Sequence, residues 1–133
     1  MPRTLRILVV EDDRDSANAL GELLRTDGFN VCLARSGEQA IEAAPVFRPD
    51  VVMLDLVMPG TDGFRTAQEL QRQPSSQSVT YVAYSGLRTP EVIAKCEELG
   101  FQHFILKPAD IGRIEDVLRS IVSQRITWNS EAL

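Results

Sequence analysis

Short apolar runs alternate with longer amphipathic segments along the whole chain. Five runs of four to six residues are mostly apolar and are bounded by charged or turn-forming residues, as strands are. The third run, residues 51–54, shows no polar alternation, which is typical of a strand buried on both faces of a parallel sheet. The expected strands cover about residues 6–10, 31–34, 51–54, 79–84 and 102–106.

The segments between these runs carry helix signals. Asp62 precedes one segment as an N-cap, and a threonine followed by Pro90 opens another. Gly28 and Gly100 stand where two helices should stop. The expected helices cover about residues 14–27, 37–45, 63–73, 90–100 and 111–122. This alternation predicts an α/β fold, a three-layer α/β/α sandwich around a five-stranded parallel sheet.

Size and composition indicate one globular domain, since the chain has 133 residues, 44% of them hydrophobic and 25% charged. We expect residues 4–125 to form it and residues 126–133 to be a C-terminal tail. A net charge of −5 without a basic stripe argues against direct nucleic-acid binding. No apolar run approaches the roughly 20 residues that cross a bilayer, so a cytoplasmic protein is expected, with Cys32 and Cys96 unpaired.

Polar residues follow four of the apolar runs at the point where each ends. Glu11 and Asp12 follow the first, Asp55 the third, Ser85 the fourth and Lys107 the fifth. The carboxyl ends of parallel strands meet at one edge of an open sheet, where ligands bind. Three acids, a hydroxyl and an ammonium group should therefore share one cleft.

The acids in this cleft need a cation. Two carboxylates about 4 Å apart repel by about 4 kcal/mol at an effective dielectric constant of 20. An all-oxygen group of ligands suits Mg²⁺, which also binds phosphate oxygens. Asp55 could then attack phosphorus, with Lys107 neutralising the phosphoryl oxygens. The alternative is that Glu11, Asp12 and Asp13 only stabilise the start of the first helix.

Four segments together resemble the receiver domain of the two-component response regulators. They are residues 7–13 (ILVVEDD), 54–60 (LDLVMPG), 85–86 (SG) and 106–108 (LKP). The resemblance implies the flavodoxin-like receiver fold, with strand order 2-1-3-4-5. It also implies phosphorylation of Asp55 by a histidine kinase or a histidine phosphotransfer protein. Asp12, Asp55 and the backbone carbonyl of Val57 would bind Mg²⁺, and Glu11 would act through water.

The same resemblance assigns a switch. Lys107 would pair with the phosphoryl group, and the peptide bond before Pro108 would be cis. Ser85 would move toward the phosphate and open space into which Phe104 could turn. The commonest residue at that position in the family is tyrosine, so the inward state of Phe104 would be held by packing alone. The surface of the fourth helix, the fifth strand and the fifth helix would then change for a downstream partner or output domain.

Two apolar residues depart from the polar residues that many relatives carry beside the site. Val57 and Leu87 stand two places after Asp55 and Ser85, where side chains influence attack by water on the phosphoryl group. We therefore expect the phosphorylated form to decay slowly. The resemblance leaves open a phosphorylation-dependent homodimer, and His103, which opens a strand, is interpreted as structural rather than as a phosphodonor.

Three other functions compete with this interpretation. A phosphohydrolase would need a second acid two residues after its nucleophile, where this chain has Val57, so no turnover enzyme is expected. An interaction module that is never phosphorylated should have lost Asp55, Asp12 or Lys107, and all three are present. A nucleotide-binding domain should have a glycine-rich loop after the first strand.

Overall fold

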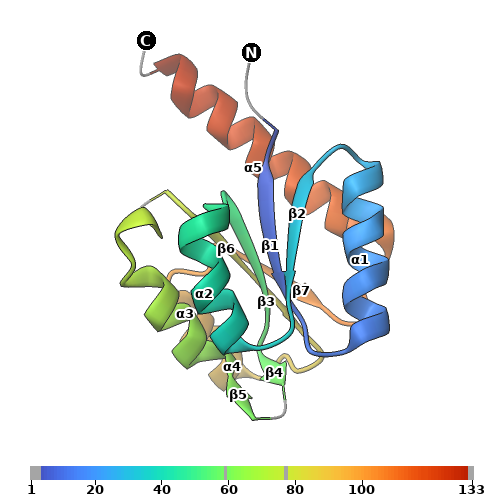
Figure 1. The fold of residues 1–133 in the computed structure, drawn as a ribbon, viewed down its shortest axis with the longest axis vertical. Coiled ribbons are helices and arrows are strands. Elements are labelled where there is room, and N and C mark those ends of the chain that lie inside the picture. The colour runs from blue at the N-terminus through green and yellow to red at the C-terminus, as the bar shows by residue number, and fades with distance from the viewer. Residues whose placement is uncertain (1–3, 59, 77, 132–133) are drawn as a thin grey trace.

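The computed structural model describes residues 4–58, 60–76 and 78–131, and it confirms the three-layer α/β/α sandwich (Figure 1). Five parallel strands form one sheet in the order β2-β1-β3-β6-β7. Counted within this sheet alone, the order is the expected 2-1-3-4-5. The sheet strands are β1 (Arg6–Val10), β2 (Asn30–Ala34), β3 (Val51–Asp55), β6 (Thr80–Ser85) and β7 (His103–Leu106).

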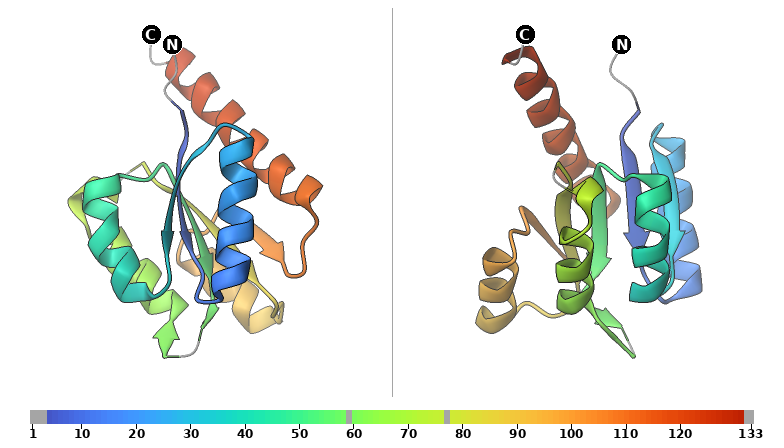
Figure 2. Two further views of the ribbon diagram at one scale, coloured as in Figure 1. Left: turned by 45° about the vertical axis from the view of Figure 1, so that its right-hand side comes forward. Right: turned by 60° about the vertical axis from the view of Figure 1, so that its left-hand side comes forward.

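Helices cover both faces of the sheet, with α1 and α5 on one side and α2, α3 and α4 on the other (Figure 2). Alternate residues of each strand enter the two cores: Val52 and Leu54 face α2 to α4, whereas Val51 and Met53 face α1 and α5. The helices are α1 (Arg14–Thr26), α2 (Gly37–Phe47), α3 (Gly63–Gln71), the 3₁₀ turn η1 (Pro74–Ser76), α4 (Pro90–Glu98) and α5 (Ile111–Glu131). None of the helices in the described ranges is long and apolar enough to cross a membrane.

A short antiparallel hairpin that the sequence did not predict follows β3. Its two strands are β4 (Val57–Met58) and β5 (Thr61–Asp62), and β5 leads directly into α3. Pro59 lies outside the described residues. Asp62 caps α3 as expected, because its side chain accepts hydrogen bonds from the backbone N–H groups of Phe64 and Arg65.

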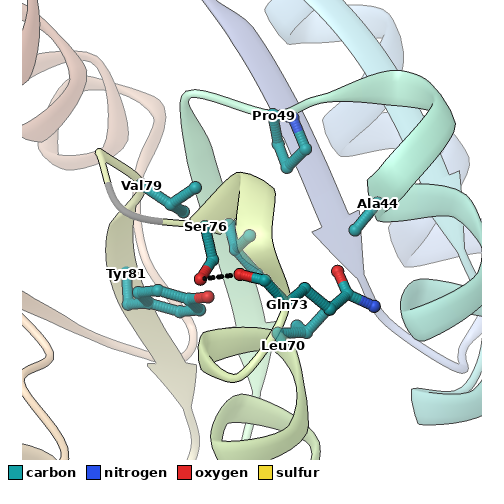
Figure 3. Close-up of a pocket in the computed structure, with 8 residues that line it drawn as sticks. Ala44, Pro49, Leu70, Gln73, Ser76, Val79 and Tyr81 are labelled. Carbon is teal, nitrogen blue, oxygen red and sulfur yellow. Dashed lines mark hydrogen bonds between the residues drawn. The ribbon is translucent and has the colours of Figure 1, made fainter.

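Helix α2 includes Pro45 and ends two residues later, at Phe47, close to the proline as expected. A proline inside a helix leaves the carbonyl four residues earlier without its usual donor. Here the side-chain amide of Gln73 donates to the carbonyl of Ile41 at 2.9 Å and replaces that donor. Figure 3 shows Gln73 beside a small pocket. The backbone carbonyl of Gln73 accepts a hydrogen bond of 2.7 Å from the Ser76 hydroxyl.

Helix α5 runs further than expected, to Glu131, so the described part of the expected C-terminal tail, residues 126–131, is helical. Arg125 anchors this part of the helix to the amino-terminal ends of two strands. Its guanidinium donates to the backbone carbonyls of Asp50 and Ser78 and forms an ion pair with the Asp50 carboxylate. These are long-range contacts, which a helix-periodicity argument cannot supply.

His103 is half-buried in β7, on the same face as Ile105 and therefore toward α5. Its Nε2 atom is buried without a hydrogen-bond partner in the described part of the chain. Burial, assisted by the positive charge of Arg113, lowers the pKa of this imidazole from its ordinary value of 6.5. The environment is that of a packed, neutral histidine.

We predict that His103, the one histidine of the sequence, titrates below pH 6.5. Because the folded state disfavours the charged imidazole, its contribution to stability is present above the unfolded pKa and is lost as the pH falls through 6.5 toward the folded pKa. An NMR titration of the single imidazole gives the midpoint directly. Arg113→Gln should raise that midpoint, and a midpoint at or above 6.5 in the parent protein would contradict the assignment.

The start of α3 requires a glycine at position 63. A Cβ atom there would lie 2.8 Å from the Leu56 Cα and 3.1 Å from the carbonyl oxygen of Asp55. We predict that Gly63→Ala lowers the free energy of unfolding by about 1–3 kcal/mol, because the loop after Asp55 must shift. Denaturant unfolding measures this, with Gly86→Ala as the matched control, since a Cβ at Gly86 meets nothing within 4 Å. Equal effects of the two substitutions would show that the close approach is not required.

Candidate functional site

The carboxyl ends of the sheet strands lie at the same edge as the β4–β5 hairpin (Figure 1). The predicted site residues end these strands or directly follow them. Lys107, which follows β7, extends its ammonium group to the acids of two other strands. Its Nζ lies 2.7 Å from Glu11 Oε1 and 2.9 Å from Asp55 Oδ2. The two acid side chains are only 4% and 6% exposed, so this ion-pair network is shielded from water.

Glu11, Asp12 and Asp55 each place a carboxylate oxygen within 4.8 Å of the others, in a group that could hold a metal ion. The second Glu11 oxygen, Oε2, is buried and has no hydrogen-bond partner in the described ranges. A buried unpaired carboxylate oxygen is costly unless a cation or donor meets it. The residues present therefore fit a hard divalent cation, the kind that carboxylate oxygens bind.

Electrostatics in the cluster reflect its excess of acid. Burial, followed by hydrogen bonding with Asp55, raises the pKa of Glu11 from 4.5 to about 7, although Lys107 opposes the shift. Burial alone would lower the pKa of Lys107, but hydrogen bonds to Glu11 and Asp55 outweigh it and raise that pKa. The ammonium form of Lys107 is thus held firmly between the two acids.

The three consecutive acids after β1 have different roles. Asp13 is the residue that caps α1, since its side chain accepts a hydrogen bond of 2.9 Å from the Ser16 N–H. Glu11 and Asp12 lie before the helix and belong to the acidic group. The helix-start interpretation therefore accounts for Asp13, and the cleft interpretation accounts for the other two.

The loop after Asp55 orients the carboxylate of that residue. The Val57 N–H donates to Asp55 Oδ1 at 3.0 Å, while the side chain of Val57 points outward and is 59% exposed. The backbone of this loop is thus directly beside Asp55. Gly63, whose role the sequence analysis missed, permits the close approach of α3 that supports it.

Ser85 and Phe104, the two residues of the expected switch, lie at the end of β6 and within β7, respectively. Ser85 is fully buried, and its hydroxyl accepts a hydrogen bond of 3.1 Å from the Leu87 N–H. Phe104 is half-buried against the core between the sheet and α2 to α4. The peptide bond between Lys107 and Pro108 is cis, as expected.

Tyr84 is a site residue that the sequence analysis missed. The Lys107 Nζ lies over its ring, 4.7 Å from the centroid. Burial raises the pKa of the phenol, and the charges of Lys107, Glu11 and Asp55 all act on it. Strand alternation could have revealed it, because Tyr84 pairs directly with Asp55 across β3 and β6.

Comparisons with known proteins identify the family of this chain. The family model described as "Response regulator receiver domain" matches residues 7–119. The transcriptional regulatory protein CpxR of Klebsiella pneumoniae is 36% identical over 126 residues, covering 95% of this chain and 52% of CpxR. A cyclic di-GMP phosphodiesterase of Thermotoga maritima is 33% identical over 108 residues, covering 80% of this chain and 28% of that protein.

A solved structure, the CheY-like response regulator receiver domain of Methylobacillus flagellatus, superimposes with a TM-score of 0.78 and 32% identity. The aligned region covers 90% of this chain and 99% of the Methylobacillus flagellatus chain. The chain spans about half of CpxR and about a quarter of the phosphodiesterase. The fold, the converged site and these matches establish one conclusion: the chain belongs to the response regulator receiver domains.

Proposed function

We propose that Asp55 is the phosphoacceptor of this receiver domain and that it takes a phosphoryl group from a histidine kinase or a histidine phosphotransfer protein. The observation that carries the proposal is the buried contact of one ammonium, Lys107, with two acids, Glu11 and Asp55, beside a third acid. A structural ion pair needs one acid for each cation. An additional pair of carboxylates is explained by a second cation, which together with Lys107 would also neutralise the oxygens of an incoming phosphoryl group.

Mg²⁺ is the cation that we propose for this group. Asp12, Asp55 and the Val57 carbonyl would hold it directly, and Glu11 through water. When bound, it supplies positive charge for the phosphoryl oxygens. The Oε2 atom of Glu11 supports this assignment. It is buried and has no hydrogen-bond partner among the described residues, and a water molecule bound to Mg²⁺ would supply one.

In the proposed reaction an Asp55 oxygen forms a bond to phosphorus as the bond to the donor's nitrogen breaks, and the donor leaves with that electron pair. The Val57 N–H holds the carboxylate in orientation. Lys107 stays in contact with the site and neutralises charge on the phosphoryl oxygens. These groups promote modification of the chain itself, and we propose no turnover of a separate substrate.

The switch follows from the contacts of Ser85. Its hydroxyl would exchange the Leu87 N–H for a phosphoryl oxygen, and the loop before α4 would move with it. Phe104 would turn into the space released and change the surface formed by α4, β7 and α5. A downstream protein, an output domain or a second phosphorylated copy would bind there.

Partners and location complete the proposal. CpxR is named a transcriptional regulatory protein, but this chain matches about half of it. With a net charge of −5, we propose that the chain itself does not contact nucleic acid directly. A cytoplasmic location goes with phosphoryl transfer from a histidine kinase and is part of the same proposal.

We predict that acetyl phosphate with Mg²⁺ adds one phosphoryl group to the wild-type protein and none to Asp55→Ala, because the nucleophile is then absent. Intact-protein mass spectrometry measures the product. Asp15→Ala is the matched control, since it removes an exposed acid from the first turn of α1. Chelation of Mg²⁺ by EDTA should abolish the reaction, and an equally modified Asp55→Ala protein would refute the assignment.

We also predict a slow loss of the phosphoryl group, because two exposed apolar side chains, Val57 and Leu87, flank the site and cannot orient water. The double variant Val57→Asn/Leu87→Glu should lose phosphate several-fold faster than wild type. Decay of the phosphorylated protein in Mg²⁺ gives the rate. Val46→Asn, at another exposed valine on α2, is the control, and an unchanged rate in the double variant would contradict the prediction.

A further inference from the structure

Four side chains of the site lie on one face of the sheet, in the order of their strands. Asp55 on β3 pairs directly with Tyr84 on β6, and Tyr84 pairs with Ile105 on β7. Lys107 stands two residues after Ile105 and therefore continues on the same face. Glu11 is related in the same way to Val9 on β1, which pairs with Met53 of β3.

This order has a consequence for Lys107. Strand β6 lies between β7 and β3 in the sheet, so the lysine side chain must cross β6 to reach Asp55. The side chain that it crosses is Tyr84, whose ring centroid lies 4.7 Å from Nζ. The Lys107 ammonium thus contacts Glu11 at 2.7 Å and Asp55 at 2.9 Å, and it also lies over the face of the Tyr84 ring.

An aromatic face is well suited to this place. A ring attracts a cation through its quadrupole and attracts it more strongly when both are shielded from water. Unlike a carboxylate, the ring adds no negative charge to a cluster that already has an excess of acids. It also restricts the flexible lysine side chain, which has large rotamer entropy when free.

We propose that Tyr84 is a positioning residue, which holds the Lys107 ammonium over Asp55 so that it meets the phosphoryl group without rearrangement. Its effect on the rate rests on the proposed phosphoacceptor function, whereas the contact itself exists without phosphorylation. The ring carries this role, and the phenolic hydroxyl does not. Phenylalanine at this position should therefore preserve the position of the Lys107 ammonium, and an aliphatic residue should not.

Packing alone is the competing explanation. Tyr84 contacts the core between the sheet and α1 and α5, as Phe29 does. A ring that only fills space should affect folding but not the position or reactivity of one ammonium group. Phe29→Leu is therefore the matched control, because it removes an aromatic ring from the same core, directly before β2, at the opposite edge of the sheet from β7.

The first experiment uses the unphosphorylated protein. NMR of the Lys107 side chain should show its ε-methylene protons shifted upfield by the ring current of Tyr84, in wild type and in Tyr84→Phe. The shift should disappear in Tyr84→Leu and persist in Phe29→Leu. Ordinary lysine shifts in the wild-type protein would overturn the inference and would leave the proposed function standing.

The second experiment measures phosphorylation rates from acetyl phosphate with Mg²⁺. Tyr84→Leu should be about fivefold slower than wild type, the order expected for loss of one shielded cation–π contact. Tyr84→Phe and Phe29→Leu should stay near the wild-type rate. Equal rates for Tyr84→Leu and Tyr84→Phe, or an equal loss in Phe29→Leu, would overturn the positioning role. If Tyr84→Leu does not fold, the wild-type and Tyr84→Phe spectra still decide whether the ring holds the ammonium.

Discussion

The burial of several acids around one ammonium group is the constraint on which the rest of this structure depends. Lys107 lies within hydrogen-bond distance of Glu11 and Asp55, and a third acid, Asp12, lies beside them. One cation cannot neutralise three carboxylates, so the site keeps excess negative charge. Burial, followed by the interaction with Asp55, raises the pKa of Glu11 to about 7. Such an arrangement favours the binding of a second cation. It also favours a change in the structure around the site when a charged phosphoryl group is added.

The sheet is what makes this burial possible. Register, rather than loop flexibility, brings the acids, Tyr84 and Lys107 to one edge, because the five strands end together. The three central strands, β1, β3 and β6, pair with a neighbour on each side, and the sheet is packed on both faces. Its rigidity holds like charges close that would separate in a loop. The stability lost in the acidic cluster is compensated by the two apolar cores on either side.

Much of this arrangement could be predicted from sequence, because it depends on local pattern. Apolar runs gave the five sheet strands, and strand ends gave Glu11, Asp12, Asp55, Ser85 and Lys107 as neighbours. Features that depend on contacts between residues far apart in the chain could not be predicted in this way. Helix α2 can continue past Pro45 because Gln73, 32 residues from Ile41, supplies the hydrogen-bond donor that the proline lacks. The continuation of α5 beyond residue 122 likewise has its anchor in Arg125, which contacts Asp50.

Tyr84 lies between the features that a local sequence pattern predicts and those that depend on long-range contacts. No motif marks it, and its neighbours in the chain suggest an ordinary strand residue. Once the strand order is known, however, alternation places Tyr84 beside Asp55 and under the path of Lys107. An expected fold can therefore be used a second time, to ask which side chains a long residue must cross to reach its partner. In a parallel sheet whose functional groups come from non-adjacent strands, the residue on the intervening strand is always such a candidate, and its chemistry decides whether it assists or obstructs.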